Sequence, residues 1–401
     1  MRGWFGTKGP LALLFLGLAA CATGPRDEPV SLSADRRASA SSATDPALLA
    51  RFAPRPRTTT TIDYALIDEA LDLMVFNSGP SLRQRGRFPE PLVGSRLVKG
   101  HTSPYRIEGN KVFFSVFDDA ARRALSDYRA SLEGIAATDR VQALPRNEQL
   151  AFWFNLHNLV VLDELTQAYP VRVPSAVRPV RGGPALHDAP IIDLGDDVVS
   201  LRDVREIVYA HWSDPKVIYG FFHGDLGGPS IRSEAYTGED VSGNLDRQAR
   251  EFVNSLRGVL GRGERLYVSE IYGEARPHYF ADWPDDLLAH LGAFADEQVA
   301  ADVAEATEVR TGQYEDRIAD MAGGDAASDL GFGYSIALPG SRAALEDNFV
   351  ERTGAMIPQS MARLAREYED KIEELRRRGY LKPKVIIIDV PTDDPADAEV
   401  E

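Results

Sequence analysis

The chain of 401 residues contains a single cysteine, Cys21. One cysteine excludes an internal disulfide, an iron–sulfur cluster and a cysteine-rich zinc site. Basic residues are also in deficit: 45 lysine and arginine residues face 61 aspartate and glutamate residues, and the formal charge is −16. Because nucleic-acid binding needs clustered positive charge, this balance argues against a nucleic-acid partner.

The N-terminal apolar run is too short to cross a membrane. It extends from Leu11 to Ala20, which is ten residues, about half of the ~20 that a spanning helix needs. Arg2 and Lys8 precede it, and a basic start before a short apolar run is typical of a secretion signal. We therefore expect residues 1–20 to be a signal peptide.

The run ends in Leu18-Ala19-Ala20-Cys21, which resembles the lipobox of bacterial lipoproteins. In that family the peptide is cut before the cysteine, and acyl chains such as palmitate are attached to it. Two or more chains anchor a protein stably where one does not. The resemblance implies a lipid bilayer contact through acylated Cys21, and Ala22 after it favours the outer membrane with the body facing the periplasm. The alternative is a plain signal peptide with an incidental cysteine.

The composition changes several times after Cys21. Residues 21–60 are rich in serine, alanine and proline without a sustained period, so we expect a flexible tether. A folded body is expected over residues 61–310 and a glycine-rich linker over 311–341. Residues 342–390 are expected to hold an amphipathic helix and a strand, and 391–401 an acidic tail.

Helices and short strands alternate irregularly in the body. Apolar spacing predicts helices over residues 62–76, 118–132, 146–168, 201–212, 244–260 and 284–309, and strands over 111–116, 191–194, 198–201, 217–222 and 265–271. Because strict βαβ alternation is missing, the pattern indicates an α+β fold.

Residues 147–158 form the most distinctive stretch, Asn-Glu-Gln-Leu-Ala-Phe-Trp-Phe-Asn-Leu-His-Asn. On a helix, Glu148, Asn155 and Asn158 share one face, and Trp153 lies on the apolar remainder. A helix that is apolar nearly all round is buried, and an unpaired buried amide costs about 1–3 kcal/mol. Asn155 and Asn158 are therefore expected either to tie down neighbouring backbone or to line a polar pocket.

This stretch resembles the signature of the domain of unknown function 547 family (DUF547). Residues 199–204, 214–219, 233–238 and 249–254 are similar to further segments of that family, so the likeness covers roughly residues 110–290. The resemblance implies a papain-like or transglutaminase-like α+β core.

The chain departs from the family pattern at the residues that would carry thiol chemistry. Family members usually have two cysteines in the turn after the 217–222 run, but here His223 and Gly228 stand at those positions. A papain-like mechanism needs a thiolate activated by an imidazole. The resemblance therefore implies a pseudoenzyme without thiol-dependent activity.

Two hypotheses follow for the function. The first is a non-catalytic envelope lipoprotein that acts in binding or assembly, with an envelope protein, peptide or glycan as partner. Its candidate pocket comprises His223, Asn155, Asn158, Trp153 and Glu148.

The second hypothesis is a cell-envelope hydrolase of peptide or amide bonds. His223 would be the general base, with Asp225 and Ser230 as carboxylate and hydroxyl, and backbone N–H groups of the glycine-rich turn could face an anion. Neither hypothesis includes a cofactor or a metal, because the grouping of His187 with aspartates 188, 193, 196 and 197 matches no recognised metal site.

Overall fold

A computed structural model of the chain describes residues 44–86, 101–138 and 140–324, together with residues 370–371, 373–374 and 377–378. The chain divides into two units, residues 1–42 and 43–401, and every described residue belongs to the second. The signal peptide, Cys21, the final strand and the acidic tail lie outside the described residues.

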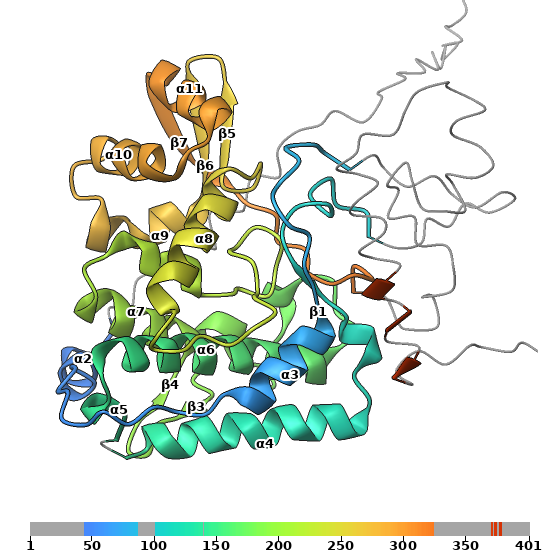
Figure 1. Cartoon of the computed structure of the whole chain (residues 1–401), viewed down its shortest axis with the longest axis vertical. Helices are drawn as coiled ribbons and strands as arrows, with labels where there is room; N and C mark the ends of the chain where they lie inside the picture. The colour runs from blue at the N-terminus through green and yellow to red at the C-terminus, as the bar shows by residue number, and fades with distance from the viewer. Residues whose placement is uncertain are drawn as a thin grey trace, which may run out of the picture. The chain divides into compact units, whose positions relative to one another are not determined.

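Helix α6 (Arg146–Ala168) lies at the centre of the fold. It begins directly after Pro145, and its side chains from Glu148 to Asp163 are all buried. The predicted helix over 146–168 and its burial are therefore confirmed. A helix surrounded by protein in this way organises the elements around it, and in Figure 1 it runs through the lower half of the molecule.

The other helices surround α6 or continue away from it. In chain order they are α2 (Pro46–Arg51), α3 (Ala65–Met74), α4 (Asp119–Ala136), α5 (Arg140–Ala143), α7 (Leu201–His211), α8 (Val241–Val253), α9 (Glu270–Tyr279), α10 (Asp285–Phe294) and α11 (Glu297–Glu305). Helices α4, α7 and α8 contact α6 directly. None of the described helices has both the length and the apolar character that crossing a bilayer requires.

The strands form three small sheets. The antiparallel pairs are β1 (Val75–Phe76) with β2 (Lys111–Val112), and β3 (Ile192–Asp193) with β4 (Val198–Val199). The third sheet has the order β5 (Val259–Arg262), β6 (Arg265–Ser269), β7 (Glu308–Gln313), with β5 antiparallel and β7 parallel to β6. Short 3-10 turns η1 (Phe114–Val116), η2 (Pro174–Ala176), η3 (Leu186–Asp188) and η4 (Pro215–Gly220) connect them. The fold is α+β, as predicted.

The strand predicted over 217–222 is wrong. These residues belong mainly to η4, which begins after Asp214, whose side chain accepts a hydrogen bond from the Lys216 backbone N–H. Pro215 in the first position fixes a helical φ, and the apolar side chains that follow are buried. A short apolar run buried on all sides fits a strand and a helical turn equally well.

The described parts of the predicted tether and linker, residues 44–60 and 311–324, contact the body. In the predicted tether, Phe52 is 1% exposed, and the backbone N–H groups of Arg55 and Arg57 donate to residues 142 and 143. In the predicted linker, β7 extends to Gln313 and Ile318 is fully buried. Their composition resembles a linker, but these contacts with distant residues order them.

The predicted C-terminal helix is described only in part. Residues 370, 371, 373 and 374 are helical, and the ammonium of Lys371 donates to the backbone carbonyl of Asp72 in α3. The remainder of the predicted amphipathic stripe lies outside the described residues.

Candidate functional site

Two asparagines of α6 hold loops in place through their backbones. The side-chain N–H of Asn155 donates to the carbonyl of Tyr236 at 2.8 Å, and its oxygen accepts from the Tyr236 N–H at 2.9 Å. Asn158 donates to the carbonyl of Gly220 at 3.0 Å and accepts from the Phe222 N–H at 2.9 Å. Of the two expectations for these residues, tying down backbone is confirmed.

Glu148 and Gln149 act in the same way near the start of α6. The Glu148 carboxylate accepts from the backbone N–H groups of Ile62 and Gly238, both at 2.9 Å. Gln149 donates to the carbonyl of Leu144 at 2.7 Å. Both side chains are buried, so each bond satisfies a backbone group that water does not reach. Glu148 is therefore a structural clamp.

Trp153 belongs to the hydrophobic core. Its side chain is fully buried, and its ring meets the ring of Phe52 edge-on at 5.4 Å between centroids. The indole N–H has no hydrogen-bond partner. The ring therefore has a packing role and is not part of a pocket.

An apolar pocket lies between α3, α4, α6 and the loop 231–236. It has a volume of about 480 Å³ including its open mouth, and we call it the α3–α6 pocket. Asn155 and Asn158 line it, but His223, Trp153 and Glu148 do not. Its apolar wall includes Ile67, Leu71 and Met74 of α3, Leu125 of α4, and Leu159 and Leu162 of α6.

His223 lies in the turn after η4 and is only 8% exposed. Its Nδ1 atom is 3.1 Å from the hydroxyl of Tyr314. Burial, and then the nearby Asp225 carboxylate to which this hydroxyl is hydrogen-bonded, raise the pKa of Tyr314. The Tyr314 hydroxyl therefore joins His223 to Asp225. Tyr314 follows β7 in the segment predicted as linker, so the sequence carried no signal for this contact.

Three imidazole rings lie close together at the turn, and we call His157, His187 and His223 the histidine cluster. The ring centroids of His187 and His223 are 5.2 Å apart, and the His157 ring lies 6.2 and 6.5 Å from them. The Nε2 atom of His187 is 2.9 Å from the backbone carbonyl of His223. Because a carbonyl only accepts, this nitrogen carries the proton.

Arg205 of α7 fixes the protonation of two of these rings. Its Nη1 atom lies 3.2 Å from Nε2 of His157 and 3.3 Å from Nδ1 of His187. Because a guanidinium only donates, both ring nitrogens must hold lone pairs, and both imidazoles are neutral. The Nε atom of Arg205 donates to the Glu274 carboxylate at 2.7 Å.

The electrostatics of the cluster agree with this bonding. Burial, and then the Arg205 charge, lower the pKa values of His157, His187 and His223, to about 4 for His187. Burial alone would raise the pKa of Glu274, but the Arg205 guanidinium holds it below its usual value. At neutral pH the cluster is three neutral imidazoles around one Arg–Glu ion pair. His157, Arg205 and Glu274 lie on the separate helices α6, α7 and α9, so the sequence carried no signal that they form a unit.

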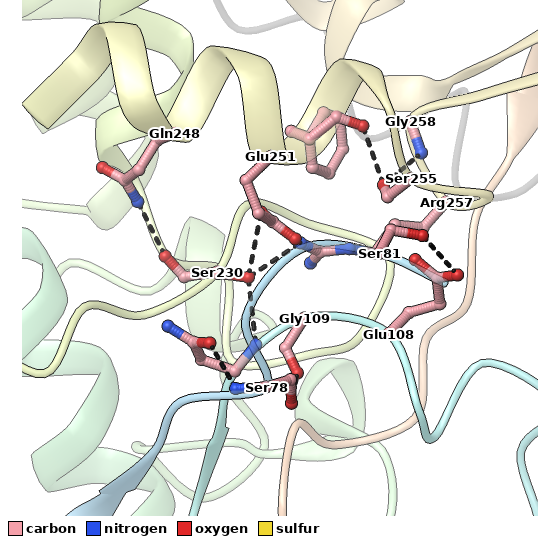
Figure 2. A network of polar contacts seen from close by, with 12 residues as sticks. Ser78, Ser81, Glu108, Gly109, Ser230, Gln248, Glu251, Ser255, Arg257 and Gly258 are labelled. Atoms are coloured by element: carbon pink, nitrogen blue, oxygen red, sulfur yellow. Dashed lines mark hydrogen bonds and ion pairs between the residues drawn. The ribbon is translucent and has the colours of Figure 1, made fainter. Parts of the chain in front are cut away.

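Ser230 is not placed to act with His223. Figure 2 shows its hydroxyl directed toward Glu251 of α8 and Arg257. The hydroxyl donates to Glu251 at 3.2 Å and accepts from Arg257 at 2.7 Å and from the Asn110 backbone N–H at 3.1 Å. The predicted His223–Asp225–Ser230 set is therefore wrong for Ser230, whose hydroxyl stabilises a buried ion pair.

Three backbone N–H groups of the turn are paired within the protein. Those of Leu226 and Gly227 donate to the carbonyls of Arg317 and Glu315, each at 2.8 Å. That of Gly228 donates to the Asp225 carboxylate at 3.0 Å. These three donors are therefore not free to bind an anion.

The acidic residues near His187 are distributed over separate ion pairs. Asp188 accepts from Arg202 at 2.7 Å, and both Asp196 and Asp197 lie against Arg51. Among the residues that the structure describes, no group of three histidines or carboxylates could hold a metal ion.

Comparison with known proteins gives one match. Residues 141–253 match the model of a family described as protein of unknown function, DUF547. No curated protein and no solved structure matches the chain, so the papain-like core stays a prediction. The matched region holds α6 with its clamps, the 223–230 turn and α8. The match over residues 141–253 is thus to the family that the signature over 147–158 predicted.

Proposed function

We propose that this chain is a lipid-anchored protein of the cell envelope whose body binds a protein or peptide partner without turning it over. The observation that carries the binding proposal is the α3–α6 pocket. Its walls are apolar, and its two amide side chains are occupied with backbone groups. Such a pocket suits the apolar anchor side chain of a partner.

The state of the predicted catalytic residues supports a non-catalytic role. The Ser230 hydroxyl is bonded to Glu251 and Arg257, and His223 is nearly buried. A general base must reach the proton that it removes. The hydroxyl that contacts His223 belongs to Tyr314 and is itself hydrogen-bonded to Asp225, so the hydrolase hypothesis loses Ser230 as its hydroxyl.

Binding can be tested with the uncharged apolar fluorescent dye Nile red and the chain that begins at Ala22. We expect saturable dye binding that Ala70→Trp weakens about tenfold or more, because a new indole at this pocket-lining position fills the space. Ala124→Trp, at an exposed position of α4 outside the pocket lining, is the matched control and should bind the dye normally. Equal binding by both variants would refute the pocket assignment.

Catalysis is tested in the same preparation. Incubation with cell-wall peptides and a protein substrate should yield no cleavage products by mass spectrometry. Hydrolysis that disappears in His223→Ala but persists in Ser230→Ala would establish the competing hydrolase and overturn the proposal.

The anchor is tested separately. Mass spectrometry of the native protein should find acyl chains on Cys21, and Cys21→Ser should release the protein from the membrane fraction. An unacylated Cys21 in the membrane-bound protein would contradict the anchor and leave the pocket unaffected.

A further inference from the structure

Helix α3 forms one wall of the α3–α6 pocket and is acidic. Its ten residues include Asp68, Glu69 and Asp72 and no basic residue. Glu69 and Asp72 are exposed, and so is Leu66, with 64% of its surface accessible. The outer face of α3 therefore offers negative charge together with an apolar side chain.

One α3 carboxylate, Glu69, lies near the pocket wall. Its neighbour Ala70 lines the pocket, and so does Tyr128 of α4, whose pKa is raised by burial and then by the charges of Glu69 and Asp63. Arg232 of the lining is already paired with Glu234 at 3.1 Å. Arg232 therefore does not offset the charge of Glu69.

The lining residues recur at helical spacing. Ile67, Leu71 and Met74 lie four and then three residues apart on α3, and Leu159 and Leu162 repeat the spacing on α6. Residues spaced in this way form a stripe along one face of each helix. A space between two such stripes fits apolar side chains that are themselves one helical turn apart.

A contact within the chain shows that the C-terminal end of α3 accepts a positive charge. The Lys371 ammonium donates to the Asp72 carbonyl in the last turn of α3, and the Lys371 side chain is only 13% exposed. Carbonyl groups at a helix C-terminus carry partial negative charge and favour cations. The negative side chains and the helix dipole thus both favour a cation at this end of α3.

We propose that the α3–α6 pocket and the acidic face of α3 together form the docking site for a basic amphipathic helix of a partner protein. The inference rests on the proposed binding function and adds the chemistry of the partner. Apolar side chains one turn apart enter the pocket, and flanking lysine or arginine residues face Glu69 and Asp72. The overall charge of −16 attracts such a segment at longer range.

The test uses two synthetic amphipathic helices as probes, one built from leucine and lysine and a twin with glutamate at every lysine position. Fluorescence anisotropy with the chain beginning at Ala22 should show saturable binding of the leucine–lysine helix. The glutamate twin should bind at least about tenfold more weakly, and added salt should weaken the cationic probe because exposed charges are screened. Ala70→Trp should remove binding, and Ala124→Trp should not.

Charge reversal locates the contact. Glu69→Lys should weaken the leucine–lysine helix about fivefold, whereas Glu305→Lys, an equal charge change at an exposed position of α11, should leave it nearly unchanged. Equal effects of the two reversals would mean attraction by net charge alone and would overturn the site.

Three further results would overturn the inference. Equal binding of both probes at the pocket would refute the inference that the partner helix is basic, and it would leave the proposed binding function unaffected. Binding of Nile red but of neither helix would refute a helical partner. Tighter probe binding in Lys371→Ala would make the chain's own C-terminal segment the occupant, because that residue contacts α3.

Discussion

Two asparagines of the α6 signature, Asn155 and Asn158, satisfy backbone groups that no sheet or helix pairs. Asn155 bonds both the N–H and the carbonyl of Tyr236, and Asn158 bridges Gly220 and Phe222. Buried backbone groups need partners, and an amide offers a donor and an acceptor in one side chain. Asparagine therefore suits these positions better than any apolar residue of similar size.

Removing one clamp should cost more than an ordinary substitution on the same helix. Asn155→Ala leaves the Tyr236 N–H and carbonyl unpaired, so the free energy of unfolding should fall by about 2–4 kcal/mol. Asn147→Ala, at an exposed position in the first turn of α6, should stay within about 0.5 kcal/mol of the parent. Urea titrations followed by circular dichroism compare the two, and equal losses would contradict the clamp.

Of the candidate site, the sequence predicted only the relations between residues that lie on the same helix. The shared face of Glu148, Asn155 and Asn158 follows from helical spacing, and the alternative of backbone bonding was visible from burial. Tyr314 and Arg205 reach His223 and His157 from other elements. Their proximity depends on chain packing, for which spacing carries no information.

At the scale of elements, local chemistry decided which predictions succeeded. Helices α4 and α7 begin at capping residues. The Asp118 side chain accepts hydrogen bonds from two backbone N–H groups at the start of α4, and Ser200 with Asp203 forms a capping box at the start of α7. The strand expected at 217–222 is wrong because Asp214 and Pro215 start a 3-10 helix just before it. The described residues of the linker expected from 311 are ordered by contacts with distant residues. Short apolar or polar runs specify little without a local start or stop signal.

The capping box of α7 yields a prediction with an internal comparison. Ser200→Ala should lower the free energy of unfolding by about 1 kcal/mol, since the hydroxyl accepts from the Asp203 N–H at the helix start. Ser131→Ala should change it little, because that exposed hydroxyl only bonds the Asp127 carbonyl one turn earlier in α4. Thermal unfolding of both variants measures the difference. A larger loss in Ser131→Ala would contradict the role of the cap.

At the scale of the whole molecule, folding buries imidazoles in their neutral form. Burial lowers the pKa values of His101, His157, His187, His223 and His290. Burial has the opposite effect on carboxyl groups such as that of Asp320, whose pKa it raises to about 7. The stability of the protein is therefore linked to pH through groups in several elements.

The histidines should make the protein lose stability as the pH falls from about 6.5. The folded pKa of His187 is about 4 against an ordinary value of 6.5, so between these values the unfolded chain binds a proton that the folded chain does not. Stability is then full above the unfolded pKa and decreases toward acid, by about 1.4 kcal/mol per pH unit for each such histidine. Asp320 has the opposite effect on stability. Between its ordinary pKa of 3.8 and its folded value of about 7, the folded chain holds a proton that the unfolded chain has lost, so this group stabilises the fold as the pH falls.

Urea unfolding at a series of pH values measures this linkage, and a variant identifies its source. His187→Gln cannot titrate, so its free energy of unfolding should fall about 1.4 kcal/mol per pH unit less steeply than that of the parent between pH 6 and 5. The comparison uses the slope, so a constant loss of stability from the substitution does not affect it. Parallel slopes in the two proteins would mean that His187 is already protonated in the folded state. That result would contradict the neutral imidazole that the Arg205 hydrogen bond requires.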